Sequence, residues 1–269
     1  MKQRLKVGFL GGGNMGGALA LAVSRASLGT DVTVFDVDTE KASALAERIG
    51  GKAAVSADTL AAECDYIFLG VKPQVMENAV KALLPALRAR KSPPVLVTMA
   101  AGLAIEKIKC FTEALAPVIR IMPNTPVSVS MGMIPYAKDG EVTEQEAKTF
   151  EALLEKAGIV DPLPESLIDA ACAVSGSGPA YVAIMAEALA DGGVACGLPR
   201  DKALLYAAQT LAGTAALILG GEHPAILKDK VTSPGGTTIA GIGALEDGGF
   251  RAAAENAVKA GYKRAKELS

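Results

Sequence analysis

Two glycine-rich turns, each followed by an apolar run at helical spacing, are the segments of this sequence best suited to bind an anion. The first reads GGGNMG over residues 11–16, and the second reads SPGGTT over residues 233–238. Unpaired backbone N–H groups and the positive end of the helix dipole bind phosphates and carboxylates at a helix start. The sequence therefore predicts two anion sites, and the chemistry depends on which anion each one binds.

The first turn has the G-x-G-x-x-G spacing of a dinucleotide-binding loop, and it follows the strand-like run Leu5–Leu10. Gly11 permits a tight turn, Gly13 lets a pyrophosphate approach the backbone, and Gly16 lets helix and strand pack closely. The alternative is a strand-to-helix turn without a ligand, but the strand before it and the helix after it favour a dinucleotide. We expect the pyrophosphate to contact the whole loop, namely Gly11, Gly12, Gly13, Asn14, Met15 and Gly16.

Asp36 ends the second strand-like run, twenty residues after Gly16. A carboxylate at this place commonly accepts hydrogen bonds from ribose hydroxyls, and it repels a 2′-phosphate. It therefore favours NADH over NADPH, although Lys41 offers a counter-charge. The alternative is that Asp36 is only a turn residue, or that Asp38 and Thr39 cap the next helix.

Three further strand-like runs end in segments that suit a ligand, because ligands of open α/β sheets bind beyond the carboxyl ends of the strands. One of these segments carries a lysine before a proline, and another holds polar residues between two prolines. The alternatives are a solvated lysine and an ordinary proline-rich turn. The predicted cofactor contacts here are Val71, Lys72, Pro73, Ala100, Ala101 and Asn124.

The first half of the chain alternates short apolar runs with stretches of helical length. Apolar runs without alternation are typical of strands buried on both faces, as in a parallel sheet. The pattern predicts an α/β fold with a Rossmann-type, doubly wound, mostly parallel sheet. The predicted strands are Leu5–Leu10, Asp31–Phe35, Tyr66–Val71, Val95–Met99 and Val118–Met122, and the clearest helices are Lys41–Ile49 and Val75–Ala89.

Strand patterns end near Leu163, and long alanine-rich helical patterns follow. They cover Leu167–Ala190, Arg200–Leu219, Ile239–Ala244 and Arg251–Glu267. We expect a Rossmann domain over residues 1–163 and an all-α dimerisation and substrate-binding domain over 164–269. The helices are apolar on more than one face and need burial on several sides, which predicts a homodimer.

Composition excludes several classes of partner. Half of the 269 residues are hydrophobic and the net charge is −2, which disfavours nucleic acid. The four cysteines form no C-x-x-C pair, so no metal site or disulfide framework is predicted. No uncharged apolar run of about 18 residues occurs, so we expect no membrane span and a cytoplasmic protein.

The sequence resembles the pyrroline-5-carboxylate reductase family nearly from end to end. The last of seven matching motifs is the most specific. They read GFLGGGNMG, VKPQ, AAGL, RIMPNTP, AVSGSGPAYV, EALADGGVACGLPR and LKDKVTSPGGTTIAGIGALEDGGFR. The resemblance implies NAD(P)H-dependent reduction of L-1-pyrroline-5-carboxylate to L-proline, the last step of proline biosynthesis. It also implies a helical dimerisation domain, frequent use of NADPH, and homodimers that in relatives often assemble as decamers of five dimers.

The implied substrate is a small cyclic imino acid whose carboxylate needs an anion site. The Gly235-Gly236 turn before a helix supplies N–H groups for it, and the resemblance implies that Thr238 bonds the ring nitrogen as the catalytic residue. The alternative is that Thr237 or Thr238 is an N-cap. The predicted substrate contacts are Ser233, Gly235, Gly236, Thr237, Thr238 and Ser177, the last of which could instead serve close packing.

Lys230 stands where relatives often have an asparagine near the cofactor, so it either touches a phosphate or points to solvent. His223, the one histidine, precedes a proline and is interpreted as a turn or helix-start residue rather than a proton donor.

Three other functions share features of this sequence. A β-hydroxyacid dehydrogenase needs a lysine base on the helix GPAYVAIMAEALADGG, which has none. A reductase of a related cyclic imine and a non-catalytic dinucleotide-binding sensor remain as alternatives.

Overall fold

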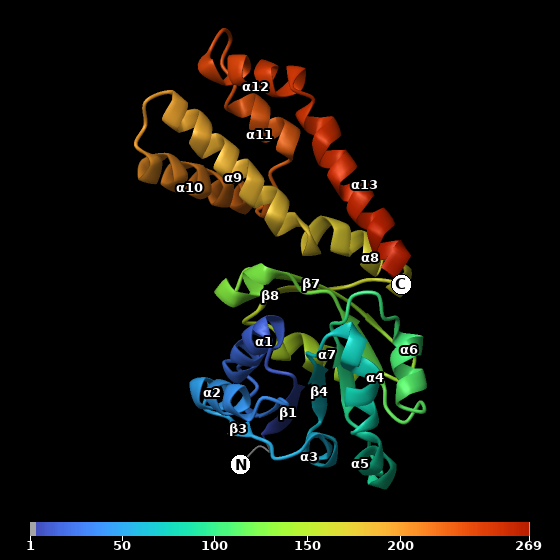
Figure 1. Cartoon of the computed structure of the whole chain (residues 1–269). Coiled ribbons are helices and arrows are strands. Elements are labelled where there is room, and N and C mark those ends of the chain that lie inside the picture. Colours follow the sequence, from blue (N-terminus) through green and yellow to red (C-terminus); the bar gives the residue numbers. More distant parts are fainter. Residues whose placement is uncertain (1–3, 269) are drawn as a thin grey trace. The chain divides into compact units, whose positions relative to one another are not determined.

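The computed structural model describes residues 4–268, which divide into two compact units. The first unit runs up to Ser177 and also contains the residues from Gly261 onward, and the second is Gly178–Ala260. The first holds the whole sheet and the second is entirely helical (Figure 1). The last strand ends at Pro162, close to the domain boundary predicted after residue 163. The first compact unit, however, continues to Ser177.

The sheet of the first unit has eight strands in the order β3-β2-β1-β4-β5-β6-β7-β8. Neighbouring strands are parallel except β6 and β7, which are antiparallel. The predicted doubly wound, mostly parallel sheet is thereby confirmed. The strands are β1 Leu5–Leu10, β2 Thr30–Phe35, β3 Lys52–Ala53, β4 Tyr66–Leu69, β5 Val95–Thr98, β6 Val118–Ile121, β7 Gly132–Lys138 and β8 Gly158–Pro162.

Helices cover both faces of this sheet (Figure 1). The sequence of β4 is apolar without interruption because its side chains are buried on both faces. Tyr66 and Phe68 lie in one buried cluster, and Ile67 and Leu69 lie in the other. One face is covered by α1 Asn14–Ser24, α2 Thr39–Ile49 and α7 Glu144–Leu153. The other is covered by α3 Ala57–Glu63, α4 Pro73–Lys81, α5 Leu84–Ala89, α6 Ile105–Phe111 and α8 Ile168–Ala171.

Cys64 belongs to the second of these clusters and is 2% exposed. Burial raises the pKa of its thiol to about 12. This thiol therefore stays neutral near pH 7 and acts as a small apolar side chain.

Several elements differ from the sequence-based expectation because of proline and short length. Strands β3, β7 and β8 were not predicted. Proline is a poor strand residue, since it donates no hydrogen bond, and Pro135 lies inside β7. The predicted helix Val75–Ala89 is two helices, and Pro85 lies in the first turn of the second.

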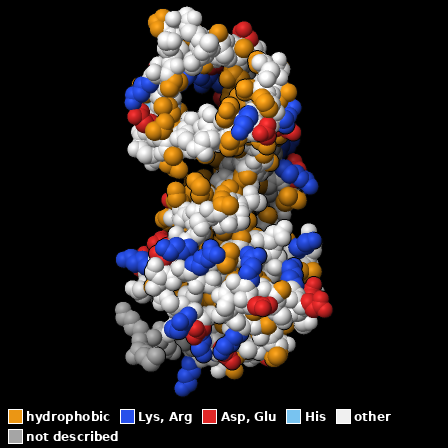
Figure 2. All heavy atoms as spheres, turned by 90° about the vertical axis from the view of Figure 1, so that its left-hand side faces the viewer, with side chains coloured by type: hydrophobic (Ala, Val, Ile, Leu, Met, Phe, Trp, Pro, Cys, Tyr) orange, Lys and Arg blue, Asp and Glu red, His pale blue; other side chains and the backbone are white. Residues whose placement is uncertain are grey.

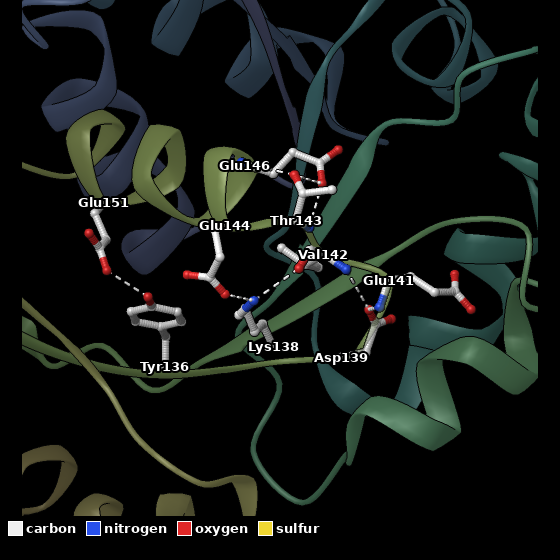
Figure 3. Close-up of polar contacts among 9 residues, drawn as sticks. All are labelled: Tyr136, Lys138, Asp139, Glu141, Val142, Thr143, Glu144, Glu146 and Glu151. Atoms are coloured by element: carbon white, nitrogen blue, oxygen red, sulfur yellow. Dashed lines mark hydrogen bonds and ion pairs between the residues drawn. The ribbon is translucent and has the colours of Figure 1, made fainter.

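The turn between β7 and α7 is fixed by its own polar contacts (Figure 3). The ammonium of Lys138 donates to the carbonyl oxygen of Val142 at 3.0 Å and to Glu144 at 2.6 Å. Thr143 and Glu146 form a capping box at the start of α7. The capping box pairs the N–H groups of Thr143 and Glu146 and so fixes the start of α7.

The helical region contains α9 Gly178–Ala195, α10 Arg200–Leu219, α11 Pro224–Lys230, α12 Thr237–Asp247 and α13 Phe250–Leu268. The sequence located α10 with the observed bounds but did not predict α11. The predicted helix Leu167–Ala190 is interrupted, since a π-helical turn over Cys172–Gly176 separates α8 from α9. Such turns insert one residue into a helix and occur often at functional sites.

Hydrophobic side chains remain exposed over the second unit (Figure 2). Two helical stretches, Glu165–Ala195 and Arg200–Leu219, would be long and apolar enough to cross a membrane by length and composition alone. Only 17% and 11% of their most apolar windows are buried. The same properties suit helices that a second chain covers, and the absence of a membrane span stays a prediction.

Candidate cofactor and substrate site

The carboxyl ends of four strands lie in register at one edge of the sheet. Leu10 of β1 pairs with Phe35 of β2 and with Leu69 of β4, and Leu69 pairs with Thr98 of β5. The residues that follow these strands therefore meet at the same edge. This places the predicted cofactor segments after β1, β2, β4 and β5 side by side, as an open α/β sheet requires.

The glycine loop has the close packing that its spacing predicted. Gly11 has φ +101°, and a Cβ there would lie 2.9 Å from the backbone of Gly70. A Cβ on Gly16 would lie 2.5 Å from the carbonyl oxygen of Gly11. At Gly13 the nearest atom would be 3.9 Å away, so the backbone is open there. The loop therefore fits a pyrophosphate at Gly13, with the other two glycines needed to hold its shape.

Helix α1 begins at Asn14 with Gly13 as its N-cap, and no side chain of the described residues caps it. Its first N–H groups directly follow the open backbone of Gly13. An anion is the usual partner of such groups. The donor set is thus suited to a pyrophosphate, as the sequence predicted.

Asp36 is held in place by the backbone. Its Oδ2 accepts from the N–H of Gly12 at 2.7 Å, and its Oδ1 accepts from the N–H of Asp38 at 3.1 Å. The ammonium of Lys41 lies 3.9 Å from Oδ2. Asp38 caps α2 by accepting from the N–H of Lys41, as one alternative proposed. The two roles are compatible, because Asp36 joins the glycine loop to the end of β2 while Asp38 starts the helix.

Two clefts border the glycine loop. One, of about 620 Å³, brings together Gly11, Asp36 and Val71 with the exposed apolar side chains of Val37 and Val55. Apolar walls beside a fixed carboxylate suit a nucleoside, whose base is flat and whose ribose carries hydroxyls.

The other cleft, of about 430 Å³, is lined by Gly12, Gly13, Asn14, Lys41 and Arg48, among others. Arg48 was not among the predicted site residues. It could have been found from its spacing, because it follows Lys41 by seven residues and so lies on the same face of α2. Two cations beside the glycine loop add positive potential at the predicted phosphate site.

The remaining predicted cofactor residues differ in how they are exposed. Lys72 is exposed and is the N-cap of α4, with Pro73 in the first turn. Ala100 is buried, whereas Ala101 is exposed. Asn124 is 9% exposed. Its Oδ1 accepts from the N–H of Met133 and its Nδ2 donates to the carbonyl oxygen of Ser175, so its amide fixes the loop after β6.

The second glycine turn opens α12 without a side-chain cap. The N–H of Gly236 donates to the carbonyl oxygen of Ser233 at 3.1 Å, and Gly235 has φ +67°. Gly236 is the N-cap of α12, so Thr237 and Thr238 are its first two residues. The alternative that a threonine is the N-cap is therefore wrong. Thr238 is half-buried, while Ser233 is exposed.

Three single residues have local roles. Ser177 closes the π-helical turn, where its N–H donates to the carbonyl oxygen of Cys172 at 2.9 Å. Lys230 is exposed and pairs with Glu222 at 2.8 Å. His223 is the N-cap of α11 and accepts from the N–H of Ala225, so the interpretation of the histidine as a helix-start residue is confirmed.

The two predicted residue sets are divided between the units. The cofactor residues lie in the first unit except for Lys230, and the substrate residues lie in the second except for Ser177.

Comparison with known proteins matches two family models, one to each part of the chain. Residues 165–268 match the model described as pyrroline-5-carboxylate reductase dimerisation, and residues 6–102 match the model described as NADP oxidoreductase coenzyme F420-dependent. The first match covers both exposed apolar helices, so the helical region is the association region of a homo-oligomer. The second covers the glycine loop, which establishes a nicotinamide dinucleotide as the cofactor.

Two relatives that match this chain almost from end to end carry the same name. The chain is 40% identical over 265 residues to the pyrroline-5-carboxylate reductase of Pisum sativum, covering 98% of this chain and 96% of the relative. It is 37% identical over 267 residues to that of Escherichia coli K12, covering 98% of each.

Solved structures agree. The pyrroline-5-carboxylate reductase of Coxiella burnetii has a TM-score of 0.91 at 30% identity and 99% coverage of both chains. The Plasmodium falciparum pyrroline carboxylate reductase with NADP bound has a TM-score of 0.86 at 30% identity and 98% coverage of both. The glycine loop, the uncapped turn before α12 and these end-to-end matches have one explanation: the chain belongs to the pyrroline-5-carboxylate reductase family of NAD(P)-dependent oxidoreductases.

Proposed function

We propose that this chain reduces L-1-pyrroline-5-carboxylate to L-proline with NADH or NADPH, as the last step of proline biosynthesis, in the cytoplasm. The observation that carries the proposal is the turn at Ser233–Thr238. It presents N–H groups at an uncapped helix start next to a half-buried hydroxyl. A small ring that carries one carboxylate and one imine nitrogen needs this pair of features.

Each part of the turn has a role. The N–H groups of Thr237 and Thr238 bind the substrate carboxylate, and Gly235 and Gly236 let it approach the backbone. The hydroxyl of Thr238 bonds the ring nitrogen and orients the C=N bond. The imine binds in its protonated form, so the chain needs no strong acid, and its one histidine is used as a helix cap. When bound, the nicotinamide supplies the hydride that adds to the imine carbon. Positioning then accounts for much of the rate.

The residues around the glycine loop give the proposed cofactor assignment. The nucleoside occupies the cleft at Asp36 and Val71, and the pyrophosphate binds at Gly13. Asp36 favours NADH by accepting from the ribose hydroxyls. The ammonium of Lys41, 3.9 Å from that carboxylate, compensates part of its charge and lets NADPH bind as well.

The exposed apolar sides of α9 and α10 form the contact between two copies in our proposal. Burying them against a second copy removes apolar surface from water, which is the dominant favourable term in such association. We further propose that five such dimers assemble into a decamer.

The direct test is to follow NAD(P)H oxidation with three kinds of substrate. We expect turnover with pyrroline-5-carboxylate to exceed that with piperideine-2-carboxylate and with 3-hydroxy acids, and the KM for NADH to be below that for NADPH. If NAD(P)H is not oxidised with any of the imines, the result would favour a non-catalytic dinucleotide-binding sensor. A preference for the six-membered ring would favour a related reductase, and a much lower KM for NADPH would reject the proposed role of Asp36.

Thr238→Ala tests the handle for the ring nitrogen. We expect kcat/KM to fall by about tenfold or more, because an unpaired polar group costs about 1–3 kcal/mol. Thr238→Ser keeps the hydroxyl and is expected to retain most of the activity. If the alanine variant keeps its kcat/KM, Thr238 has no part in the reaction.

A further inference from the structure

The loop between β5 and α6 is in backbone contact with the last described turn of α13. Gly102 in this loop has φ +76°, and a Cβ there would lie 2.5 Å from the carbonyl oxygen of Leu268. Ala100 and Ala101, two predicted cofactor contacts, directly precede it. The segment from Gly261 onward belongs to the first unit, so α13 ends as a structural part of the cofactor-binding unit.

A line of charged groups joins the same helix to the same loop. The ammonium of Lys266 lies 3.2 Å from Oδ2 of Asp169, and Oδ1 of Asp169 accepts from Arg120 at 2.9 Å. Arg120 also contacts Glu165 at 3.3 Å, and Glu165 accepts from the N–H of Ile105 at 2.7 Å. Ile105 is the first residue of α6. The loop is thus held at Gly102 by α13 and at Ile105 by the charged groups.

The centre of this line is buried. Arg120 is 3% exposed and Asp169 is 6% exposed. Arg120 pairs in register with Thr98, the last residue of β5. Arg120 therefore lies beside the strand end from which the loop leaves. The two cations and the two carboxylates balance in charge, which suits a buried arrangement.

The order of strands places this loop on one half of the cofactor. In a doubly wound sheet the dinucleotide crosses the edge where the strand order reverses, which here lies between β1 and β4. Asp36 follows β2 on one side of that point, and the loop after β5 lies on the other side. With the nucleoside at Asp36, the loop at Ala100–Gly102 is adjacent to the nicotinamide half.

We propose that Lys266 and the Gly102–Leu268 contact position the β5–α6 loop for the nicotinamide half of the cofactor. This proposal rests on the proposed function, because that function places the cofactor along the sheet edge. Lys266 is a positioning residue, since it acts through Asp169 and Arg120. Loss of the contact moves the loop and weakens binding of the nicotinamide, while the adenosine half stays bound.

Two pairs of variants separate positioning from general damage. Lys266→Met removes an ammonium whose side chain is 47% exposed and replaces neither Arg120 nor Asp169. Lys259→Met is its control, on the same helix, where the lysine forms only an exposed pair with Glu255. Gly102→Ala introduces the Cβ that meets Leu268. Gly29→Ala is its control, because Gly29 has φ +69° but no atom within 4 Å of the added Cβ.

The measurement is calorimetric binding of the preferred nucleotide, NADH or NADPH, and of the matching ADP-ribose that lacks nicotinamide. We expect Lys266→Met to raise the Kd of the nucleotide about 3- to 10-fold. We expect Gly102→Ala to raise it about 5- to 100-fold. The Kd of the ADP-ribose stays within about twofold in both variants, and both controls match the unmodified protein on both ligands.

Other results overturn the proposal. Equal weakening of both ligands would show general damage, and unchanged binding in Lys266→Met would show that the contact does not position the loop, even if Gly102→Ala does not fold. An unmodified protein that binds neither ligand would refute the proposed function together with this inference. An active protein whose variants behave like their controls would refute this inference alone.

Discussion

Replacing Arg120 with methionine is expected to lower the free energy of unfolding by about 3–5 kcal/mol. The guanidinium is 3% exposed and lies between the carboxylates of Asp169 and Glu165. Removing it takes a cation away from the nearly buried carboxylate of Asp169, whose side chain is 9% exposed, and the ammonium of Lys266 that remains at 3.2 Å belongs to a side chain that is 47% exposed. Urea unfolding followed by circular dichroism measures the change. Protein concentration is kept equal, because association adds to apparent stability.

Arg88→Met is the matched control. Arg88 contacts Glu113 at 2.6 Å, a shorter distance than either contact of Arg120, but both side chains are at least half exposed. The hydrogen bond and charge of Arg88 lower the pKa of Glu113. Any stabilisation is therefore present above the ordinary pKa of a glutamate and is lost as the pH falls through the lowered value. Because solvent screens this exposed pair, we expect a much smaller loss of stability in this variant than in Arg120→Met. Equal losses in the two variants would contradict burial as the cause.

Gly16→Ala is expected to weaken NAD(P)H binding by about 10- to 100-fold, from the roughly 1–3 kcal/mol that overpacking costs. The added Cβ would lie 2.5 Å from the carbonyl oxygen of Gly11. Since that neighbour is backbone, the loop itself must shift, and the N–H groups that bind the pyrophosphate shift with it. Calorimetric titration with NADH and NADPH measures the loss.

The next residue provides the control. A Cβ on Gly17 would have its nearest neighbour, the carbonyl oxygen of Gly12, at 3.7 Å, an ordinary contact. Gly17→Ala also improves helix propensity within α1, so we expect affinity within about threefold of the unmodified protein. A similar loss in both variants would mean that the close approach at Gly16 does not shape the site.

The sequence was most informative where one physical requirement determined the pattern. Residues 7–10 are apolar without interruption because both faces of β1 are buried there, and the predicted bounds Leu5–Leu10 are the observed ones. The bounds of α10 were also predicted, because Pro199 precedes the helix and glycines follow it. The glycine loop was recognisable because Gly11 and Gly16 each lie close to neighbouring backbone, whereas the backbone at Gly13 is open.

The parts that could not be predicted depend on distant residues. Ala100 and Ala101 were predicted as cofactor contacts, but the contact of the next residue, Gly102, with Leu268 joins positions far apart in the chain. Asn124 was predicted to face the cofactor, and only the structure shows that its amide bonds Met133 and Ser175. Strand β7 was missed because Pro135 argues against a strand locally, while pairing on both sides outweighs that preference.

The two outermost strands limit how copies of this protein can meet. An open sheet can grow from chain to chain by edge-to-edge pairing, and natural proteins prevent this with short strands, charges and proline at the margins. Here β3 has only two residues, one of them Lys52, and both are exposed. At the opposite margin β8 ends in the exposed residues Asp161 and Pro162. Neither margin offers a long apolar template, so the sheet resists fibril-like growth and leaves self-recognition to the helices.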